Sequence, residues 1–406
     1  MQLNSILCSA LIVLFQATTF TWILADDWIC WRGADRNGIS REVGWIDEWP
    51  ETEPKQLWKA NLGTGFSSMV VAKGQLYSMG NSDDIDSVVC LDALSGKLLW
   101  SHSYPSPLDD RFFEGGPTST PTLDGSNVFV FSRKGDVISL DAATGRVIWS
   151  KNLPDATGVD IPGWGFAGSP LVLGEQLILS AGQSGTALNK STGEVLWTSS
   201  GEAGYMTPLS IQTKLGQSVI IASGKFFHGV DPVSGSVRWR QRWLTTFGCN
   251  AADPIFYRDR LFISSGYNRG SAVLELSSET PAIVWETKEF QNQWSSSVLE
   301  DGFVYGVDGN DTGDRTLKCL EFETGKIHWT FDGLGSASIM AANHRLIVLS
   351  DQGELVIAPA SPVAFHPTAR AKVLEGKCWT VPVLSNGLIY CRNASGELVC
   401  LDVRKR

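Results

Sequence analysis

Leu91-Asp92-Ala93-Leu94-Ser95-Gly96-Lys97-Leu98-Leu99-Trp100 is the stretch that decides the fold, because it recurs along the chain. The further copies are LDAATGRVIW (140–149), LNKSTGEVLW (188–197), VDPVSGSVRW (230–239), LEFETGKIHW (320–329) and the degenerate LELSSETPAIVW (274–285). Each copy predicts a strand that ends before an acidic or Asn residue, a tight turn at Ser/Thr-Gly, and a strand that ends on Trp. The tryptophans lie about 45 residues apart, a period typical of propellers and solenoids.

A second, small-residue motif follows the tryptophans and predicts the innermost strand of each repeat. Small side chains suit the crowded axis of a propeller, and Pro is tolerated because the innermost strand is a sheet edge. The eight copies are FSSMVV (66–71), TSTPTL (118–123), AGSPLV (167–172), YMTPLS (205–210), AADPIF (251–256), WSSSVL (294–299), ASIMAA (337–342) and WTVPVL (379–384).

Eight innermost strands predict an all-β fold, an eight-bladed β-propeller of four-stranded antiparallel blades. The seventh blade has no Trp, and we expect residues 371–374 to be its outer strand. The sequence of the eighth blade ends at its third strand, 398–402, so this blade lacks an outer strand. Residues 54–60 predict one additional strand, with Trp58 in the position of the outer-strand Trp. We therefore expect this N-terminal strand to complete the last blade and close the ring. The tryptophans expected to dock neighbouring blades are Trp58, Trp100, Trp149, Trp197, Trp239, Trp285 and Trp329.

The beginning of the chain predicts export. Residues 1–25 are mainly apolar and carry no charged side chain, which indicates a secretory signal peptide or, as the alternative, an uncleaved anchor. Residues 26–53 form a lead-in segment before the propeller of residues 54–406, and no later stretch is apolar enough to span a bilayer. The formal net charge of −10, without a long basic run, argues against nucleic acid as a partner. The expected location is periplasmic or secreted.

The cysteines leave disulfide pairing open. Cys90, Cys319 and Cys400 occupy one repeat position and are expected to be small buried residues of different blades. Cys378 and Cys391 flank an expected hairpin, where a bridge remains an alternative.

The repeat LDaxTGkxxW, over residues 54–402, resembles that of pyrroloquinoline-quinone (PQQ) propellers, a family that includes quinoprotein alcohol dehydrogenases and the outer-membrane-protein assembly factor BamB. The stretch WRGADRNGIS (31–40) resembles the lead-in of secreted bacterial PQQ-repeat proteins. The resemblance implies either an enzyme with PQQ and Ca²⁺ or a scaffold, because one fold hosts both.

Several features favour a non-catalytic protein. The chain has no adjacent cysteine pair, no CxxCH haem motif and a short length for a quinoprotein dehydrogenase. We therefore expect no catalytic residues, no metal and no cofactor, with PQQ plus Ca²⁺ kept as the alternative. The weak Ca²⁺ candidate is the Gly-rich loop with Asp308, Asn310, Asp311 and Asp314, which we interpret as a solvated hairpin.

The residues that open the innermost strands suggest a binding site. Four of the eight are aromatic (Phe66, Tyr205, Trp294 and Trp379) and the other four are small. They should ring one mouth of the axial channel, with Trp164 and Asn250 just upstream of two strands and Arg111 and Glu114 on the loop into the second blade. Such rings either form a funnel for a ligand or peptide, or plug the axis, and the two interpretations are compatible.

The function predicted from sequence is a non-catalytic periplasmic binding or scaffold propeller resembling BamB. It would bind protein or a small-molecule ligand at its rim or channel mouth. The alternatives are a PQQ-dependent dehydrogenase and a carbohydrate- or polymer-binding module.

Overall fold

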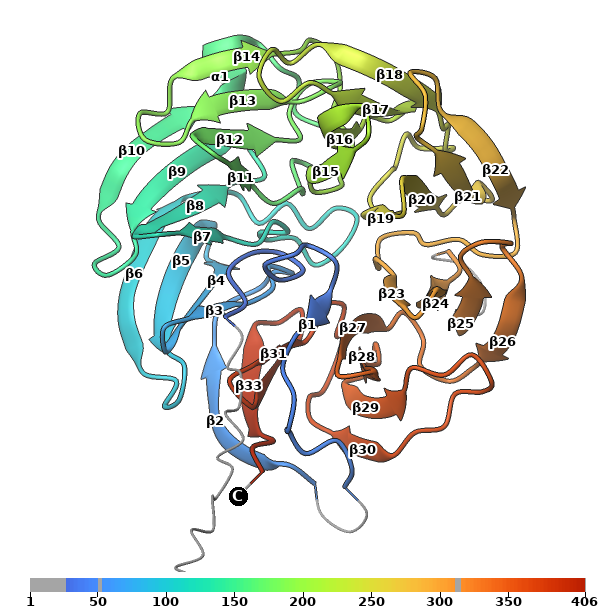
Figure 1. Ribbon diagram of the computed structural model, residues 1–406. Coiled ribbons are helices and arrows are strands. Elements are labelled where there is room, and N and C mark those ends of the chain that lie inside the picture. The colour runs from blue at the N-terminus through green and yellow to red at the C-terminus, as the bar shows by residue number, and fades with distance from the viewer. Residues whose placement is uncertain (1–26, 50–52, 311–314, 406) are drawn as a thin grey trace, which may run out of the picture.

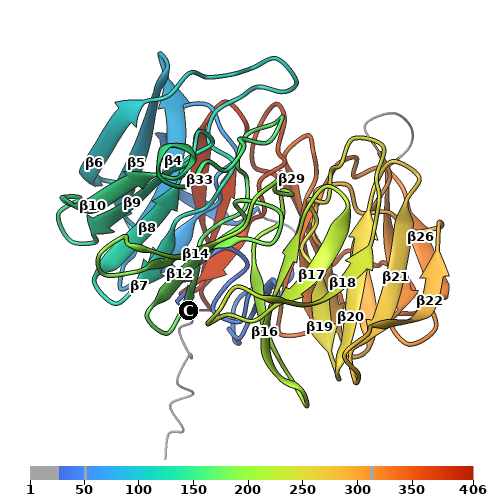
Figure 2. The same cartoon turned by 90° about the horizontal axis from the view of Figure 1, so that it is seen from above.

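The computed structural model describes residues 27–49, 53–310 and 315–405, which form eight sheets around a central axis (Figure 1). Figure 2, turned by 90°, shows the propeller from the side, with the strands of neighbouring blades side by side. The eight-bladed β-propeller predicted from the repeats is confirmed. Within the described residues, the one helix is the short α1 (Leu153–Thr157). The predicted signal peptide lies outside the described residues.

Blades one to four each consist of four consecutive strands. Blade one contains β3 (Val70–Ala72), β4 (Gln75–Ser82), β5 (Ile85–Asp92) and β6 (Leu98–Pro105). Blade two contains β7 (Thr122–Asp124), β8 (Asn127–Phe131), β9 (Asp136–Asp141) and β10 (Val147–Asn152). Blade three contains β11 (Leu171–Leu173), β12 (Gln176–Leu179), β13 (Thr186–Asn189) and β14 (Val195–Thr198). Blade four contains β15 (Leu209–Thr213), β16 (Gly216–Ala222), β17 (Phe226–Val230) and β18 (Val237–Arg242).

Blades five to eight continue the pattern, and the last two recruit N-terminal strands. Blade five contains β19 (Ile255–Tyr257), β20 (Arg260–Ser265), β21 (Gly270–Glu275) and β22 (Ala282–Thr287). Blade six contains β23 (Val298–Glu300), β24 (Phe303–Asp308), β25 (Thr316–Glu321) and β26 (Ile327–Phe331). Blade seven contains β27 (Ser338–Ala342), β28 (Arg345–Leu349), β29 (Glu354–Pro359) and β30 (Ala369–Lys372), with β1 (Ile39–Ser40) beside β27. Blade eight contains β31 (Val383–Ser385), β32 (Leu388–Arg392), β33 (Glu397–Asp402) and β2 (Lys55–Asn61).

The ring closes as predicted, because β2 pairs antiparallel with β33 from Lys55–Asp402 to Asn61–Glu397. The expected outer strand of blade seven is shifted by two residues, since β30 pairs with β29 from Ala369 to Lys372. Residues 373 and 374 instead donate their backbone N–H groups to the carbonyl of Gly353, which turns the chain away from the strand.

The outer-strand tryptophans dock each blade onto the next one. The indole N–H of Trp58 donates to the carbonyl of Ala93 at 3.0 Å, and that of Trp100 donates to the carbonyl of Ala142 at 2.9 Å. The same bond to the following blade is made by Trp149, Trp197, Trp285 and Trp329. Trp239 instead packs into the apolar cluster between blades four and five.

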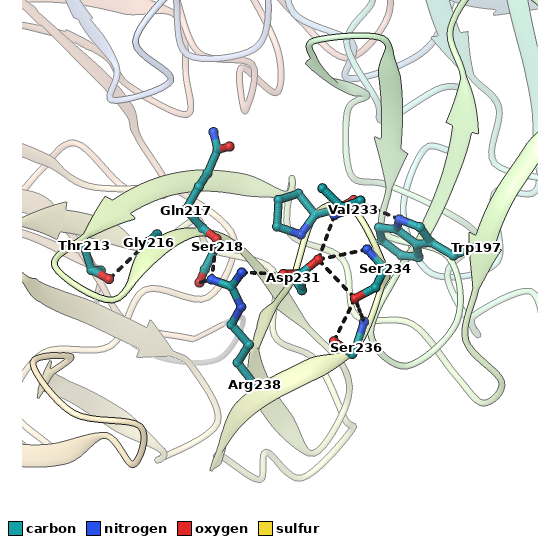
Figure 3. Close-up of polar contacts among 11 residues, drawn as sticks. Trp197, Thr213, Gly216, Gln217, Ser218, Asp231, Val233, Ser234, Ser236 and Arg238 are labelled. Atoms are coloured by element: carbon teal, nitrogen blue, oxygen red, sulfur yellow. Dashed lines mark hydrogen bonds and ion pairs between the residues drawn. The ribbon is translucent and has the colours of Figure 1, made fainter.

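The repeat turn is built around its aspartate. In blade four, Asp231 accepts hydrogen bonds from the backbone N–H groups of Val233 and Ser234 and from Arg238 (Figure 3). These hydrogen bonds lower the pKa of Asp231 to about 2, and the bond from the backbone N–H of Ser234 contributes most. Gly235 follows at φ +71°, and a Cβ there would lie 2.6 Å from the indole of Trp197. The glycine therefore serves both the left-handed turn and the close approach of the preceding blade.

The small-residue segments enter the sheets later than the sequence predicts. Only their last residues form β3, β7, β11, β15, β19, β23 and β31, and β27 alone takes up most of its segment. The reason is that the third residue of most segments bonds the neighbouring blade rather than its own. The backbone N–H of Ser68 donates to Thr120 Oγ1, that of Thr120 to Ser169 Oγ, and the series continues through Thr207 and Asp253 to Ser296.

The lead-in segment crosses the axis and contacts blade after blade (Figure 1). Trp28 pairs with Val71 of blade one, and the carbonyl of Ile29 accepts from Leu123 of blade two. The Arg36 guanidinium donates to the carbonyl of Pro170 in blade three, and β1 pairs parallel with β27 of blade seven. The Glu42 carboxylate accepts from the backbone N–H of Gly387 in blade eight at 2.9 Å. The sequence located this segment but did not predict that it spans the ring.

The seven described cysteines are free thiols, and six of them are buried. Cys90, Cys319 and Cys400 are buried in three different blades, as expected. Burial is the main cause that raises the pKa of each of these three thiols, to about 12. Cys378 and Cys391 are both buried free thiols as well.

Acid is expected to weaken the propeller through His228 on β17, which is 1% exposed. Burial lowers the pKa of His228 to about 4, below its ordinary value of 6.5. The unfolded chain therefore binds the proton first, so stability falls as the pH drops from about 6.5 to about 4, by up to about 3 kcal/mol. Urea unfolding across this range should show a smaller acid loss for His228→Gln, which cannot titrate. An equal loss in both proteins would contradict this assignment.

Candidate functional site: an aromatic axial cavity

A cavity of about 1480 Å³ lies on the propeller axis. Ten of its lining residues are aromatic, and they come from the loops that lead into seven of the blades, from blade five itself and from the lead-in segment. Phe112 and Phe247 are 66% and 60% exposed, which marks the open rim. Trp31 of the lead-in segment also lines the cavity, and because this segment crosses the axis, it forms the floor.

The structure places five of the sequence-predicted residues in this lining: Phe66, Trp164, Tyr205, Trp294 and Trp379. The centroids of Trp294 and Trp379 are 4.9 Å apart with planes at 33°, so the two rings touch. We call them the tryptophan pair. Phe66 continues the series at 5.8 Å from Trp379. Burial raises the pKa of the Tyr205 hydroxyl, which stays neutral at ordinary pH.

The other three predicted residues lie around the cavity and do not line it. Asn250 is fully buried, and its amide donates to the carbonyls of Ser223 and Trp243. The Arg111 side chain is exposed and pairs with Asp109 at 2.9 Å. Glu114 pairs with Lys377 at 2.6 Å. The Lys377 ammonium lies 4.2 Å from the ring centroid of Trp379, so this ion pair braces one member of the tryptophan pair.

An aromatic wall on blades one to five was not predicted beyond Trp164 and Tyr205. Its rings meet mostly edge to face, for example Trp164 with Tyr205 at 5.3 Å and Phe247 with Tyr267 at 5.0 Å. The aromatic wall consists of Phe112, Phe113, Trp164, Tyr205, Phe247 and Tyr267. The feature of the sequence that could have indicated this wall is the doublet Phe112-Phe113, which lies in a long loop between blades and outside the repeat.

Buried Arg133 positions one part of this wall. Its guanidinium donates to the carbonyl of Leu108 at 3.1 Å and to that of Trp164 at 3.0 Å. The same group lies 4.9 Å from the ring centroid of Phe113. Arg133 thus ties the loop that carries the phenylalanine doublet to the loop that carries Trp164.

The floor is built on a buried ion pair between the lead-in segment and blade five. Asp253 Oδ2 accepts from the indole N–H of Trp31 at 2.5 Å and lies 4.0 Å from Arg32 Nε. Burial raises the pKa of the Asp253 carboxyl, and the Arg32 charge opposes that shift. Arg32 also donates to the carbonyls of Asn37 and Ser297, which anchors the floor to blade six.

Polar side chains gather on blades six and seven. Gln293 donates to Tyr267 Oη at 2.9 Å and accepts from Arg315 at 3.1 Å. Asp351 accepts from the backbone N–H of Ser336, and Asp332 is exposed and makes no hydrogen bond or ion pair with any described residue. We call Gln293, Arg315, Asp332 and Asp351 the polar sector. It lies across the axis from blades two and three (Figure 1).

The weak Ca²⁺ candidate lies on the connection between β24 and β25. Asp308 pairs with Lys318 at 2.6 Å, and its carboxylate also accepts from the backbone N–H of Gln291. Asn310 accepts from the backbone N–H of Tyr267. Asp311 and Asp314 lie outside the described residues. The two described members are thus engaged by protein groups.

Fold and cavity together define a PQQ-repeat propeller with a ligand-sized axial cavity. The family described as outer membrane protein assembly factor BamB matches residues 85–331, and the chain belongs to this family. A comparison with curated proteins finds no match.

Solved structures agree on the fold. BamB from Moraxella catarrhalis is 16% identical, with a TM-score of 0.65 over 87% of this chain and 99% of that protein. The quinohemoprotein alcohol dehydrogenase from Comamonas testosteroni is 14% identical, with a TM-score of 0.70 over 94% of this chain and 81% of that protein. A europium-containing methanol dehydrogenase is 10% identical, with a TM-score of 0.69 over 90% of this chain and 89% of that one. Identities this low show the fold alone. Among the described residues, no helix is long and apolar enough to cross a membrane.

Proposed function

We propose that this chain is an exported, non-catalytic binding propeller, similar in architecture to BamB, that holds its ligand in the aromatic cavity. The observation that carries the proposal is the cavity itself, which has ten aromatic side chains and a floor made by the lead-in segment. Exposed aromatic surface is costly in water, and a concave, mostly apolar site with a few polar groups is what ligands bind. The ligand is a small molecule or a slender segment of a partner protein.

The periplasmic or extracellular location is part of the proposal. It rests on the apolar, uncharged residues 1–25 and on the family to which the chain belongs. The charge of −10 supports a partner other than nucleic acid.

The residues of the cavity do not fit PQQ, a planar tricarboxylate. A planar ligand held between two rings needs a gap of about 7 Å, twice the ~3.5 Å contact distance, and the tryptophan pair is 4.9 Å apart. Asp332 and Asp351 line the cavity with the single lining cation Arg315, and the third lining carboxylate, Asp253, is paired with Arg32. A ligand with three carboxylates would meet net repulsion there. These features support the proposal of a binding protein without a quinone cofactor.

Ligand retention tests the proposal. Immobilised protein is exposed to a soluble extract of the extracytoplasmic space, washed and eluted, and the eluate is analysed by mass spectrometry. The wild type should retain a defined set of molecules that the double variant Trp294→Ala/Trp379→Ala loses, because the stacking surface is gone. The control is Leu98→Ala/Leu99→Ala on the outer strand β6, which removes exposed apolar side chains away from the cavity. Identical eluates from wild type and the tryptophan variant would contradict the proposal.

A further inference from the structure

We propose that the ligand is a neutral carbohydrate chain, an inference that rests on the proposed binding function and names the class of molecule bound. The geometry that points to it is an aromatic wall that adjoins a polar sector, with Tyr267 of the wall hydrogen-bonded to Gln293 of the sector. A sugar ring has two matching surfaces, because its C–H faces are apolar and its equatorial hydroxyls point outward. The faces stack on aromatic rings, and the hydroxyls pair with carboxylate, amide and guanidinium groups.

The polar sector offers the groups that hydroxyls need. A carboxylate accepts two or more hydrogen bonds, while a hydroxyl both donates and accepts. Exposed Asp332 directly follows β26, and half-buried Asp351 lies in the turn after β28, where it already accepts from the Ser336 backbone N–H. Gln293 is fixed between Tyr267 and Arg315, so its amide is held in one orientation. A sector that holds planar polar groups in place can select the orientation of a hydroxyl.

The size of the cavity favours several sugar units. Sites for small molecules span about 300–1,000 Å³, and this cavity exceeds that range at about 1480 Å³. The floor at Trp31 and Asp253 limits how deep a chain can reach, so the ligand enters from the rim with Phe112 and Phe247. An oligosaccharide end, inserted toward the floor, fills this shape.

Two other classes fit less well. Anionic ligands meet two lining carboxylates, Asp332 and Asp351, against the one lining cation Arg315, and the net charge of −10. An extended peptide would pair with a free strand edge. The edges of β3 and β27 that face the axis are instead contacted by the lead-in segment, at Trp28–Val71 and Ile39–Ala341. The segments ahead of β3, β7, β11, β15 and β19 each donate a backbone N–H to the next blade. Much of the backbone around the axis is therefore already bonded, and the fit is to hydroxyls and C–H faces.

The test is a titration of the purified protein with neutral hexasaccharides of glucose, xylose, mannose and N-acetylglucosamine, followed by calorimetry and tryptophan fluorescence. We expect at least one to bind with a Kd of about 1 mM or tighter. Trp164→Ala should weaken that binding about tenfold by removing a stacking face of the aromatic wall, and Asp332→Ala should weaken it about tenfold by removing a charged acceptor. Glu279→Ala, an exposed acidic residue on the outer rim of blade five, should leave it unchanged.

Failure of this inference is distinguishable from failure of the proposed function. If no hexasaccharide binds at about 1 mM, or if neither cavity variant weakens binding, the carbohydrate inference is overturned. Retention of other molecules from the extract, such as peptides, with loss in Trp294→Ala/Trp379→Ala, would then leave the proposed binding function standing. If the protein retains no molecule from the extract and binds no hexasaccharide, both the proposed function and the carbohydrate inference are overturned.

Discussion

Replacing Arg32 by alanine is expected to lower the free energy of unfolding by about 3–5 kcal/mol, because the variant leaves the carboxylate of Asp253 buried without its countercharge. The side chains of Arg32 and Asp253 are 1% and 8% exposed. The variant also removes the bonds from Arg32 to the carbonyls of Asn37 and Ser297. Urea unfolding followed by tryptophan fluorescence measures the loss.

Arg41→Ala is the matched control for that experiment. Arg41 lies on the same lead-in segment and pairs with Asp35, but the two side chains are 67% and 43% exposed. An exposed pair of this kind contributes about 0–1 kcal/mol. Equal losses in the two variants would show that the buried pair does not hold the floor in place.

Replacing Gly145 by alanine is expected to destabilise the propeller by about 2–4 kcal/mol. Left-handed backbone costs a side chain about 1–2 kcal/mol, and Gly145 has φ +71°. A Cβ there would also lie 2.5 Å from the indole of Trp100, so the preceding blade must shift. Overpacking of this kind costs about 1–3 kcal/mol. The measurement is again urea unfolding.

Gly125→Ala separates the two contributions within the same blade. Gly125 has φ +61°, and a Cβ there meets no atom within 4 Å, so only the backbone cost applies. Combining Gly145→Ala with Trp100→Ala should give less than the sum of the single losses, because the clash disappears with the ring. Additive losses, or equal losses for both glycines, would contradict the docking role of the repeat glycine.

The blades could be predicted from sequence because their determinants are local. Each copy of the repeat carries its own turn aspartate, glycine and docking tryptophan, so agreement among copies identifies the element. Blade seven was misplaced by two residues at β30 because it lacks the tryptophan that fixes the register elsewhere. Closure by β2 was predictable because a lone strand with Trp58 matched a missing outer strand.

The floor of the cavity could not be predicted, because the lead-in segment has no repeat and its contacts join it to residues far away in the sequence. Its ion pair joins Arg32 to a residue 221 positions away, Asp253, which the sequence presents only as one member of a small-residue motif. The hydrogen-bonded series from Ser68 to Ser296, in contrast, has a recognisable pattern in the sequence. The third position of six inner segments is Ser, Thr or Asp, and its side chain serves the neighbouring blade.

Five of the ten aromatic residues that line the cavity could be predicted. The residues that open the inner strands occupy one repeat position, so Phe66, Tyr205, Trp294 and Trp379 were identified together. The rest of the aromatic wall and the polar sector come from loops of unequal length, where the repeat gives no register. Their assembly depends on long-range contacts such as those of Arg133.

The central claim is that the cavity binds a ligand without carrying quinone chemistry. Calorimetric titration of the purified protein with PQQ, with and without Ca²⁺, tests that claim most directly. We expect no saturable heat under either condition, because the tryptophan pair leaves no gap for a planar ligand and the lining carries more carboxylates than cations. Saturable, Ca²⁺-dependent binding of one PQQ per chain would contradict it and indicate a dehydrogenase.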